Sequence, residues 1–161
     1  MKKEKIMRPP KVPPRVAPIL VIGDSIVDIY REGERLGLSA ETPTVVGKDI
    51  RRKISIGGAA LVARNILALG REVTFISLVG KDDAGKEVAR LADPHLTLHL
   101  IKENRTTTAK ERFWIGGYKL LQWDYRDNRP ISKDSEEAIV RYYKKNLSRF
   151  DKVIISDYRH G

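Results

Sequence analysis

The segment ISIGGAALVARNILALG, residues 54–70, contains a predicted strand-to-helix junction. A short β-branched run leads into two adjacent glycines, Gly57 and Gly58, and the residues after them have the apolar spacing of one helix face. Gly70 is a stop signal for this helix. The apolar stripe consists of Ala59, Val62, Ala63, Ile66 and Leu67. The pattern predicts a strand that passes directly into a helix, with the glycine pair at the junction.

Outward from this junction, strand-like and helix-like segments alternate. Three continuous apolar runs predict strands that are buried on both faces. These runs occupy residues 18–24, 72–80 and 151–158. Helices are predicted for residues 82–93 and 132–150, the second with Ser132 or Asp134 as its cap. The order predicts an α/β domain over residues 18–161, with a central, mostly parallel sheet flanked by helices.

A second group of strands does not fit this central sheet. Residues 29–55 contain short alternating pieces around glycines and Pro43, which predict half-buried strands. Three more strands are predicted, and Gly116 and Gly117 signal a hairpin between the last two. They occupy residues 96–103, 106–115 and 119–125. We therefore expect a β element that projects from the core.

Composition limits the function classes. The 161 residues are 41% apolar with no run long enough to cross a bilayer, and no cysteine is present for a disulfide or a thiolate metal site. We expect a cytoplasmic protein with no membrane partner and no metal site. Half of the formal net charge of +10 lies in residues 1–17, a proline-rich stretch that we interpret as a disordered leader. It is either a solubilising extension or a weak tether to an anionic surface.

The candidate site lies where the first strand and the glycine pair meet. Without a Cβ, Gly57 and Gly58 let the backbone approach a ligand, and the unpaired N–H groups of the first helical turn are expected to face that ligand. The glycine pair also suits close packing of helix on sheet. Asp24 and Asp28 follow the first strand, at the edge where open α/β sheets bind ligands. We expect Asp24 to form a turn or cap. Asp28 lies among apolar neighbours, and a carboxylate there favours a functional role.

Several collinear motifs resemble the ribokinase-like (PfkB) carbohydrate kinases, and among these the heptose-phosphate kinases. The resemblance extends from about residue 18 to residue 161. It rests on VIGDSIVDIY, SAETP, GGAALVARNILALG, VTFISLVGKDDAGKE, TTTAKERF, LLQWDYRD and IISDYRHG. It implies a ribokinase-like central sheet with a small β lid over the sugar, the lid lying at residues 30–55 and 107–123. It also implies ATP and Mg²⁺ as cofactors of the complete enzyme, and a homodimer formed through the lid.

The resemblance assigns roles to individual residues. It makes Asp28 an acceptor of sugar hydroxyls, and Gly57 and Gly58 the backbone that closes on the sugar. Lys110 and Arg112 match basic positions that face a substrate phosphate, or they form a solvated face of the lid. The remaining positions of the cleft are Asp24, Asp157 and His160, and the last stands where the family pattern has lysine.

Two departures from the family pattern affect the expected function. Leu61 replaces an asparagine that contacts sugar, so we expect altered specificity or weaker binding. Asn65 matches a second asparagine, which either compensates in part or ties the helix to a strand. No later G-A-G-D motif is present, and this motif would carry the base and the anion hole of phosphoryl transfer. The sequence therefore predicts no catalytic residue in this chain, no activity for the chain alone, and an end before the nucleotide-binding half.

Three function classes follow. The first is the sugar-binding part of an ATP-dependent carbohydrate kinase, which phosphorylates a heptose 7-phosphate or related sugar at the anomeric hydroxyl for lipopolysaccharide precursors. The second is a non-catalytic sugar-binding module or a split-kinase subunit that needs a partner. The third is a nucleotide or nucleic-acid binder, which we disfavour. Only Gly23 stands where a dinucleotide fold requires G-x-G-x-x-G, and lid packing explains the aromatic residues between 113 and 123.

Overall fold

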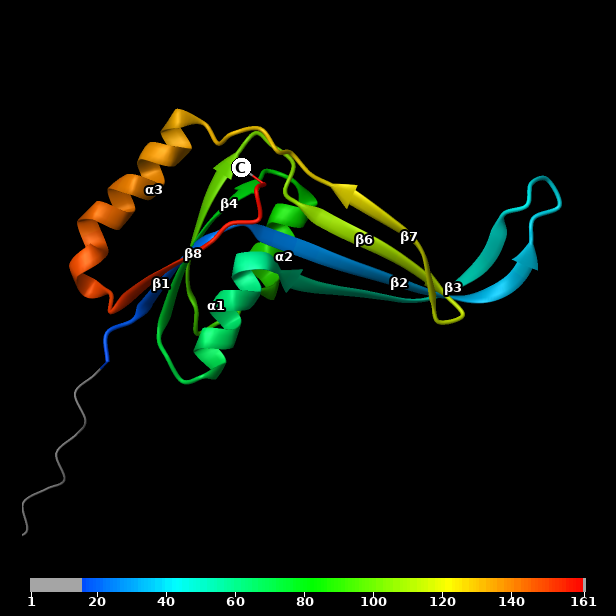
Figure 1. The fold of residues 1–161 in the computed structure, drawn as a ribbon, viewed down its shortest axis with the longest axis horizontal. Coiled ribbons are helices and arrows are strands. Elements are labelled where there is room, and N and C mark those ends of the chain that lie inside the picture. The colour runs from blue at the N-terminus through cyan, green and yellow to red at the C-terminus, as the bar shows by residue number, and fades with distance from the viewer. Residues whose placement is uncertain (1–15, 161) are drawn as a thin grey trace, which may run out of the picture.

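The computed structural model describes residues 16–160, so the predicted leader lies almost entirely outside the described residues. These residues form two four-stranded sheets and three helices (Figure 1). None of the described helices is long and apolar enough to cross a membrane.

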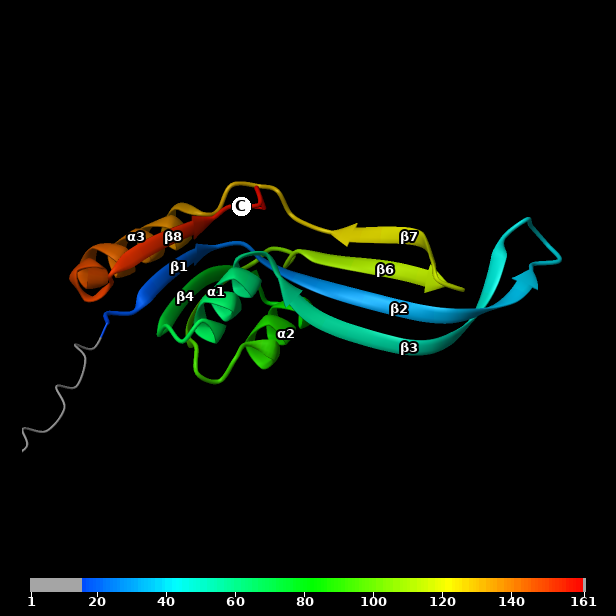
Figure 2. The ribbon, with the colours of Figure 1, turned by 60° about the horizontal axis from the view of Figure 1, so that its bottom comes forward.

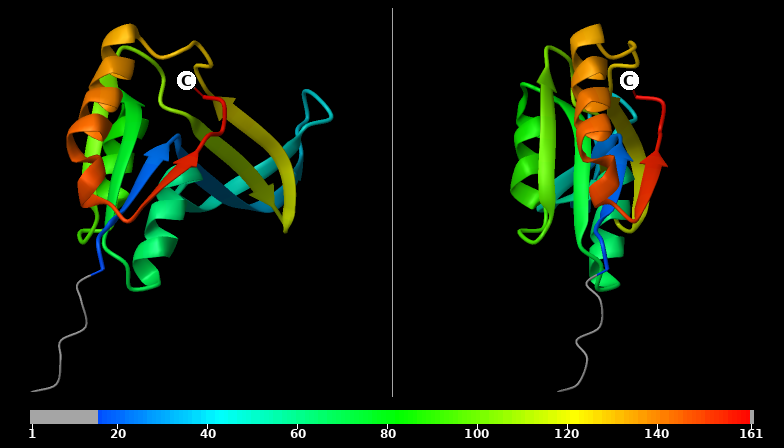
Figure 3. Two further views of the ribbon diagram at one scale, coloured as in Figure 1. Left: turned by 60° about the vertical axis from the view of Figure 1, so that its left-hand side comes forward. Right: turned by 90° about the vertical axis from the view of Figure 1, so that its left-hand side faces the viewer.

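The first sheet is fully parallel, with the strand order β5-β4-β1-β8. Its strands are β1 (Ile19–Gly23), β4 (Val73–Gly80), β5 (Thr97–Glu103) and β8 (Lys152–Ser156). The helices are α1 (Gly58–Ala68), α2 (Asp83–Leu91) and α3 (Lys133–Asn146), and the 3-10 turn η1 (Leu147–Arg149) follows α3. Helices α1 and α2 cover one face, and α3 lies over β5 on the other (Figure 2, Figure 3). This arrangement confirms the predicted α/β fold.

The core lies between α1 and the central strands. Phe75 on β4 is buried against the alanines of α1, and Val21 on β1 belongs to the same cluster. Full burial of a side chain of this size stabilises the fold by about 1.5–3 kcal/mol. The predicted apolar stripe of α1 is confirmed, because its members are buried in this cluster or packed against it.

The second sheet is the predicted β element, and we call it the lid. Its strand order is β3-β2-β6-β7, with β2 and β6 parallel and the outer pairs antiparallel. The strands are β2 (Ser25–Leu38), β3 (Val45–Gly57), β6 (Ala109–Ile115) and β7 (Tyr118–Tyr125). The sheet extends away from the three helices (Figure 1). Gly116 and Gly117 both have positive φ, which confirms the predicted hairpin.

Two expectations about strands were wrong. The run at residues 151–158 was expected to be a doubly buried strand, but β8 is an edge strand and Ile155 is 74% exposed. An apolar run does not reveal which strand of a sheet lies at its edge. The lid was also expected to begin at residue 30. Instead β2 begins at Ser25, so Asp28 lies inside the lid sheet.

The helix caps agree with the sequence patterns. Ser132, one of the two predicted caps of α3, accepts a hydrogen bond from the Ser135 amide. Asp82 caps α2 in the same way by accepting from the Gly85 amide. Both caps fix chain segments at the carboxyl edge of the first sheet, next to the base of the lid.

Candidate functional site

Asp28 is held on the lid by an ion pair. Its Oδ1 lies 2.5 Å from Nη1 of Arg112, and each side chain is only about one-fifth exposed (19% and 20%). The Arg112 guanidinium also lies over the ring of Tyr30, 5.3 Å from its centroid. The cross-strand register pairs Asp28 with Lys110 and Tyr30 with Arg112, so all four side chains share one face of the lid. The face therefore presents a positioned carboxylate beside two basic groups.

Gly57 and Gly58 lie directly against this carboxylate and its strand. A Cβ at Gly57 would lie 2.5 Å from Oδ2 of Asp28, and a Cβ at Gly58 would meet the backbone oxygen of Asp24. Gly58 also has a φ of +59°, which favours glycine. The aspartate and the glycine pair, 29 positions apart in the sequence, thus converge on one place.

The entrance of α1 differs from the expectation in one respect. The backbone N–H groups of its first turn were expected to face a ligand. The Ala59 N–H instead donates to the Asp24 carbonyl oxygen at 2.9 Å. This donor ties the helix to the end of β1, which leaves Asp28 as the principal polar group at the junction.

Lys110 is also paired with a carboxylate. Its Nζ lies 3.2 Å from Oδ2 of Asp124 on β7. The hydrogen bond from Gln122 is the main cause that lowers the pKa of Asp124; burial acts in the opposite direction, and Lys110 lowers the pKa further. Asp124 is thus ionised at neutral pH. An anion that binds Lys110 and Arg112 must compete with Asp124 and Asp28.

Asp24 holds the segment that follows β8. Its Oδ2 accepts hydrogen bonds from the backbone N–H of Tyr158 at 2.7 Å and of His160 at 3.4 Å. Asp157 accepts from the Arg159 amide within its own turn, and the His160 ring contacts Asn128 at 3.2 Å. The residues expected in the cleft therefore meet, but through backbone groups that order the turn.

Arg105 is a positioning residue that the sequence did not reveal. Its Nη2 donates to the carbonyl oxygens of Asp127, Arg129 and His160 at 2.6, 3.1 and 2.7 Å. One guanidinium thereby joins three segments: the residues after β5, those after β7 and those after β8. Because the partners are backbone oxygens, no pairing pattern in the sequence could have identified them.

Asp82 fixes the base of the lid from the other side. Its carboxylate accepts from the backbone N–H and the hydroxyl of Thr107, the residue that leads into β6, at 2.8 and 2.7 Å. Burial would raise the pKa of Asp82, but the hydrogen bonds from Thr107 and Gly85 lower it overall. The charged form of Asp82 is therefore the one that the fold stabilises.

Asn65 does not join this group of residues. Its side chain is exposed on α1, and no hydrogen bond connects it with Asp28 or with any other residue in the described part of the chain. Leu61 is half-buried one turn earlier on the helix. At the junction, the structure therefore unites Asp28, Gly57, Gly58, Arg112 and Lys110, and it leaves Asn65 apart.

The fold resembles part of the fold of several solved kinase structures. It resembles the carbohydrate kinase from Agrobacterium tumefaciens, with a TM-score of 0.61 at 22% identity over 87% of this chain and 45% of that one. It also resembles the phosphofructokinase-2 from Escherichia coli in complex with fructose-6-phosphate, with a TM-score of 0.60 at 16% identity over 88% and 45%. The chain belongs to the pfkB family of carbohydrate kinases, whose family model matches residues 17–111.

Curated relatives lie closer in sequence. The chain is 34% identical over 146 residues to the bifunctional protein HldE of Sulfurimonas denitrificans. The aligned region covers 89% of this chain and 31% of the relative. It is 36% identical over 148 residues to the D-beta-D-heptose 7-phosphate kinase of Bordetella bronchiseptica. That alignment covers 90% of this chain and 46% of the relative. The chain thus spans 31% and 46% of the length of these two relatives, less than half of each.

Proposed function

We propose that this chain is the sugar-binding part of an ATP-dependent carbohydrate kinase that phosphorylates a heptose 7-phosphate, or a related sugar phosphate, at its anomeric hydroxyl. The observation that carries the proposal is the position of the Asp28 carboxylate, which lies against Gly57 and is paired with Arg112 on the face of the lid. The names of the relatives support the substrate class. A cytoplasmic role in making lipopolysaccharide precursors belongs to the same proposal.

Different residues of the site bind the sugar ring and the phosphate of the substrate. A carboxylate accepts hydrogen bonds from two neighbouring hydroxyls, so Asp28 binds the sugar ring and fixes its orientation. The missing Cβ at Gly57 lets the ring approach the backbone. Arg112 and Lys110 lie on the same face and bind the substrate phosphate, because a guanidinium and an ammonium form charge-assisted hydrogen bonds with phosphate oxygens.

Binding of such a substrate requires an exchange of partners. In the structure Arg112 neutralises Asp28, and Lys110 neutralises Asp124. A phosphate that draws Arg112 away leaves Asp28 able to accept hydroxyls, so the two ends of one substrate assist each other. A sugar without a phosphate has to break the same ion pair unaided, and we expect it to bind more weakly.

ATP and Mg²⁺ belong to the proposal for the complete kinase. Within residues 16–160 no group of three histidine, aspartate or glutamate side chains is placed to hold a metal ion. The role derived for this chain is therefore confined to binding and orienting the sugar.

A homodimer through the lid is a further part of the proposal. Leu36, Leu38 and Ile50 near the lid tip are each more than 60% exposed. The Trp114 indole N–H on the lid is also buried without a hydrogen-bond partner among the described residues. Apolar side chains in this number favour contact with another protein surface. Analytical ultracentrifugation of the chain and of a Leu36→Glu variant tests this homodimer. The unchanged chain should sediment as a dimer and the variant as a monomer.

Calorimetric titration with heptose 7-phosphate and with the unphosphorylated heptose tests the proposed substrate. We expect the phosphorylated sugar to bind at least about tenfold more tightly, since it gains charge-assisted contacts with Arg112 and Lys110. An Arg112→Gln variant should lose most of that preference. Asp49→Asn, which changes an exposed carboxylate on β3, is the matched control and should bind like the wild type. Equal affinity of the wild type for both sugars would contradict the proposal.

A further inference from the structure

The face of the lid that carries Asp28 holds a basic residue that the proposed sugar site does not use. This residue is Lys53 on β3, which the strand register places opposite Tyr30. We propose that Lys53 determines the specificity of the sugar site, because its ammonium binds the substrate phosphate together with Arg112. This inference rests on the proposed function, and it names a residue that makes the site select a phosphorylated sugar.

The strand register places Lys53 on the same face as the sugar site. Strand β3 pairs Ser55 with Asp28 and Lys53 with Tyr30, and residues that are directly opposite in adjacent strands share one face of a sheet. On the other side of β2, strand β6 pairs Tyr30 with Arg112. Lys53 and Arg112 therefore flank Tyr30 from two sides. The opposite face of these strands contributes to the apolar cluster with α2, so the face with Lys53 is the one left open.

The geometry allows one phosphate to contact both cations. Neighbouring strands lie about 4.8 Å apart, so the backbones at Lys53 and Arg112 are separated by about 10 Å, which two long side chains can bridge through a phosphate. The Arg112 guanidinium already lies over the Tyr30 ring, 5.3 Å from its centroid. Tyr30 also lines a hollow of about 530 Å³, which Trp114 lines from β6. The space beside the ring is therefore open to a ligand.

Lys53 differs from the other basic residues on this face because it has no carboxylate partner. Arg112, Lys110 and Arg51 are each paired with a carboxylate at 2.5–3.2 Å. Lys53 is exposed, and no ion pair or hydrogen bond connects it with another residue among residues 16–160. A phosphate therefore binds Lys53 without displacing a carboxylate from it.

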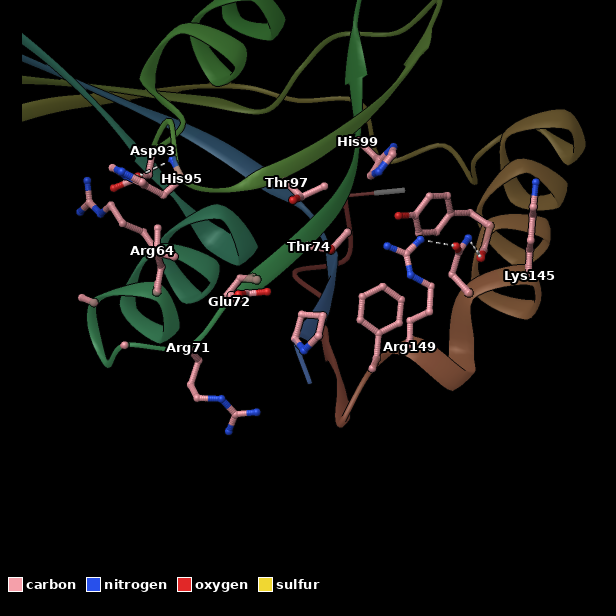
Figure 4. Close-up of a pocket in the computed structure, with 18 of the residues that line it drawn as sticks. Arg64, Arg71, Glu72, Thr74, Asp93, His95, Thr97, His99, Lys145 and Arg149 are labelled. Carbon is pink, nitrogen blue, oxygen red and sulfur yellow. Dashed lines mark hydrogen bonds and ion pairs between the residues drawn. The ribbon is translucent and has the colours of Figure 1, made fainter. Parts of the chain in front are cut away.

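The basic residues at the far end of the first sheet do not share one face in this way. In the hollow at the amino ends of β4 and β5, Arg64 lies on α1 and Lys145 lies on α3 (Figure 4). These two helices cover opposite faces of the first sheet. Arg71 in the same hollow is paired with Asp151 at 2.9 Å. The lid face, in contrast, places an unpaired cation and the guanidinium of the sugar site around one ring.

The unpaired charge matters because substrate binding changes the charge balance at Asp28. When Arg112 turns from Asp28 toward a phosphate, one guanidinium faces two anionic groups. Lys110 remains offset by Asp124. Lys53 supplies a further positive charge, and its charge-assisted hydrogen bond with the phosphate stabilises the complex. A sugar without a phosphate makes no such contact, so Lys53 favours the phosphorylated substrate.

Calorimetric titration of the full chain with heptose 7-phosphate and with the unphosphorylated heptose, in salt of about 0.15 M, tests the role of Lys53. Lys53→Gln should bind the phosphorylated sugar about threefold to tenfold more weakly and the unphosphorylated sugar within about twofold of the wild type. Lys53→Arg keeps the charge and should bind both sugars within about threefold of the wild type. The matched control is Arg52→Gln, which removes the same charge from an exposed neighbour whose register partner is Arg31, on the opposite face. It should change either affinity less than about twofold.

Three results would overturn the role of Lys53. They are unchanged binding of the phosphorylated sugar by Lys53→Gln, equal losses of both sugars in that variant, and equal losses in Lys53→Gln and Arg52→Gln. Neither side chain has an ion pair or hydrogen bond among the described residues, so urea unfolding should give the same free energy for both variants and the wild type.

Amide NMR with orthophosphate separates this inference from the proposed function. Shifts at Lys53 and Arg112 that disappear in Lys53→Gln would support the phosphate contact even if the wild type bound both sugars equally, a result that contradicts the proposed function alone. A preference for the phosphorylated sugar that Lys53→Gln retains in full would overturn the inference alone.

Discussion

Gly57→Ala tests the contact between the glycine pair and Asp28. The backbone at Gly57 has φ −126° and ψ −163°, an extended conformation that alanine adopts without strain. The only close obstacle to a Cβ is Oδ2 of Asp28 at 2.5 Å, since the next atoms lie at 3.6 Å or beyond. That distance is roughly 1 Å shorter than an ordinary carbon contact. The effect of the methyl group therefore depends on whether Asp28 can move.

Asp28 cannot move freely, because its Oδ1 is held by Arg112. Forcing a methyl group into such a contact costs about 1–3 kcal/mol. Replacing glycine by alanine at a compatible φ returns about 0.4–1 kcal/mol by restricting the unfolded chain. We therefore expect Gly57→Ala to lower the free energy of unfolding by about 1–2 kcal/mol. In an Asp28→Ala background the obstacle is gone, and the same change should raise it by about 0.4–1 kcal/mol.

Urea unfolding of the four proteins, followed by far-ultraviolet circular dichroism, measures this sign change. Asp28→Ala leaves Arg112 unpaired, but that cost is common to both proteins that carry it and cancels in the double-mutant cycle. An equal destabilisation by Gly57→Ala in both backgrounds would show that the methyl group clashes with something other than the Asp28 carboxylate.

Three further predictions concern the surroundings of the site. Since the pKa of Asp82 is lowered on folding, the stability it contributes is present above its unfolded pKa and is lost as the pH falls through the folded value. Acid should therefore destabilise the wild type more steeply than Asp82→Asn in urea titrations between about pH 5 and pH 2, and parallel curves would contradict this. Arg105→Gln should speed amide hydrogen exchange at His160 at least about tenfold, since it removes the group that joins three segments; unchanged exchange would exclude that role. Leu61→Asn should tighten the binding of heptose 7-phosphate measured by calorimetry, and equal affinities would show that the family asparagine is not needed here.

The sequence predicted the elements that depend on local patterns. The periodicity after Gly58 predicts α1, and the paired glycines at residues 116 and 117 predict the β6–β7 hairpin, because the neighbouring residues alone decide these structures. The edge position of β8 was missed for the opposite reason. Its apolar residues are the same whether a strand lies inside a sheet or at its edge, and only tertiary neighbours distinguish the two.

The sequence named Asp28, Gly57, Gly58, Lys110 and Arg112, which the structure brings together, but it did not predict their pairing or the separation of Asn65 from them. Asp28 was predicted as a site residue because it is a carboxylate among apolar residues. Arg112 was predicted because it matches a basic position of the family pattern. Their ion pair joins positions 84 residues apart, and it depends on the parallel register of β2 and β6. No local signal in the sequence specifies that register. Arg105 was missed because its partners are backbone carbonyls, which every residue possesses.

The proposed function requires Asp28, the glycine pair and Arg112 to form one sugar pocket. Two-dimensional amide NMR of the isotopically labelled chain, titrated with heptose 7-phosphate, tests it most directly. We predict that the largest shifts fall on Asp28, Gly57, Gly58 and Arg112, and that Asp28→Ala abolishes them. Shifts confined to the amino ends of β4 and β5, or shifts that persist in Asp28→Ala, would contradict it.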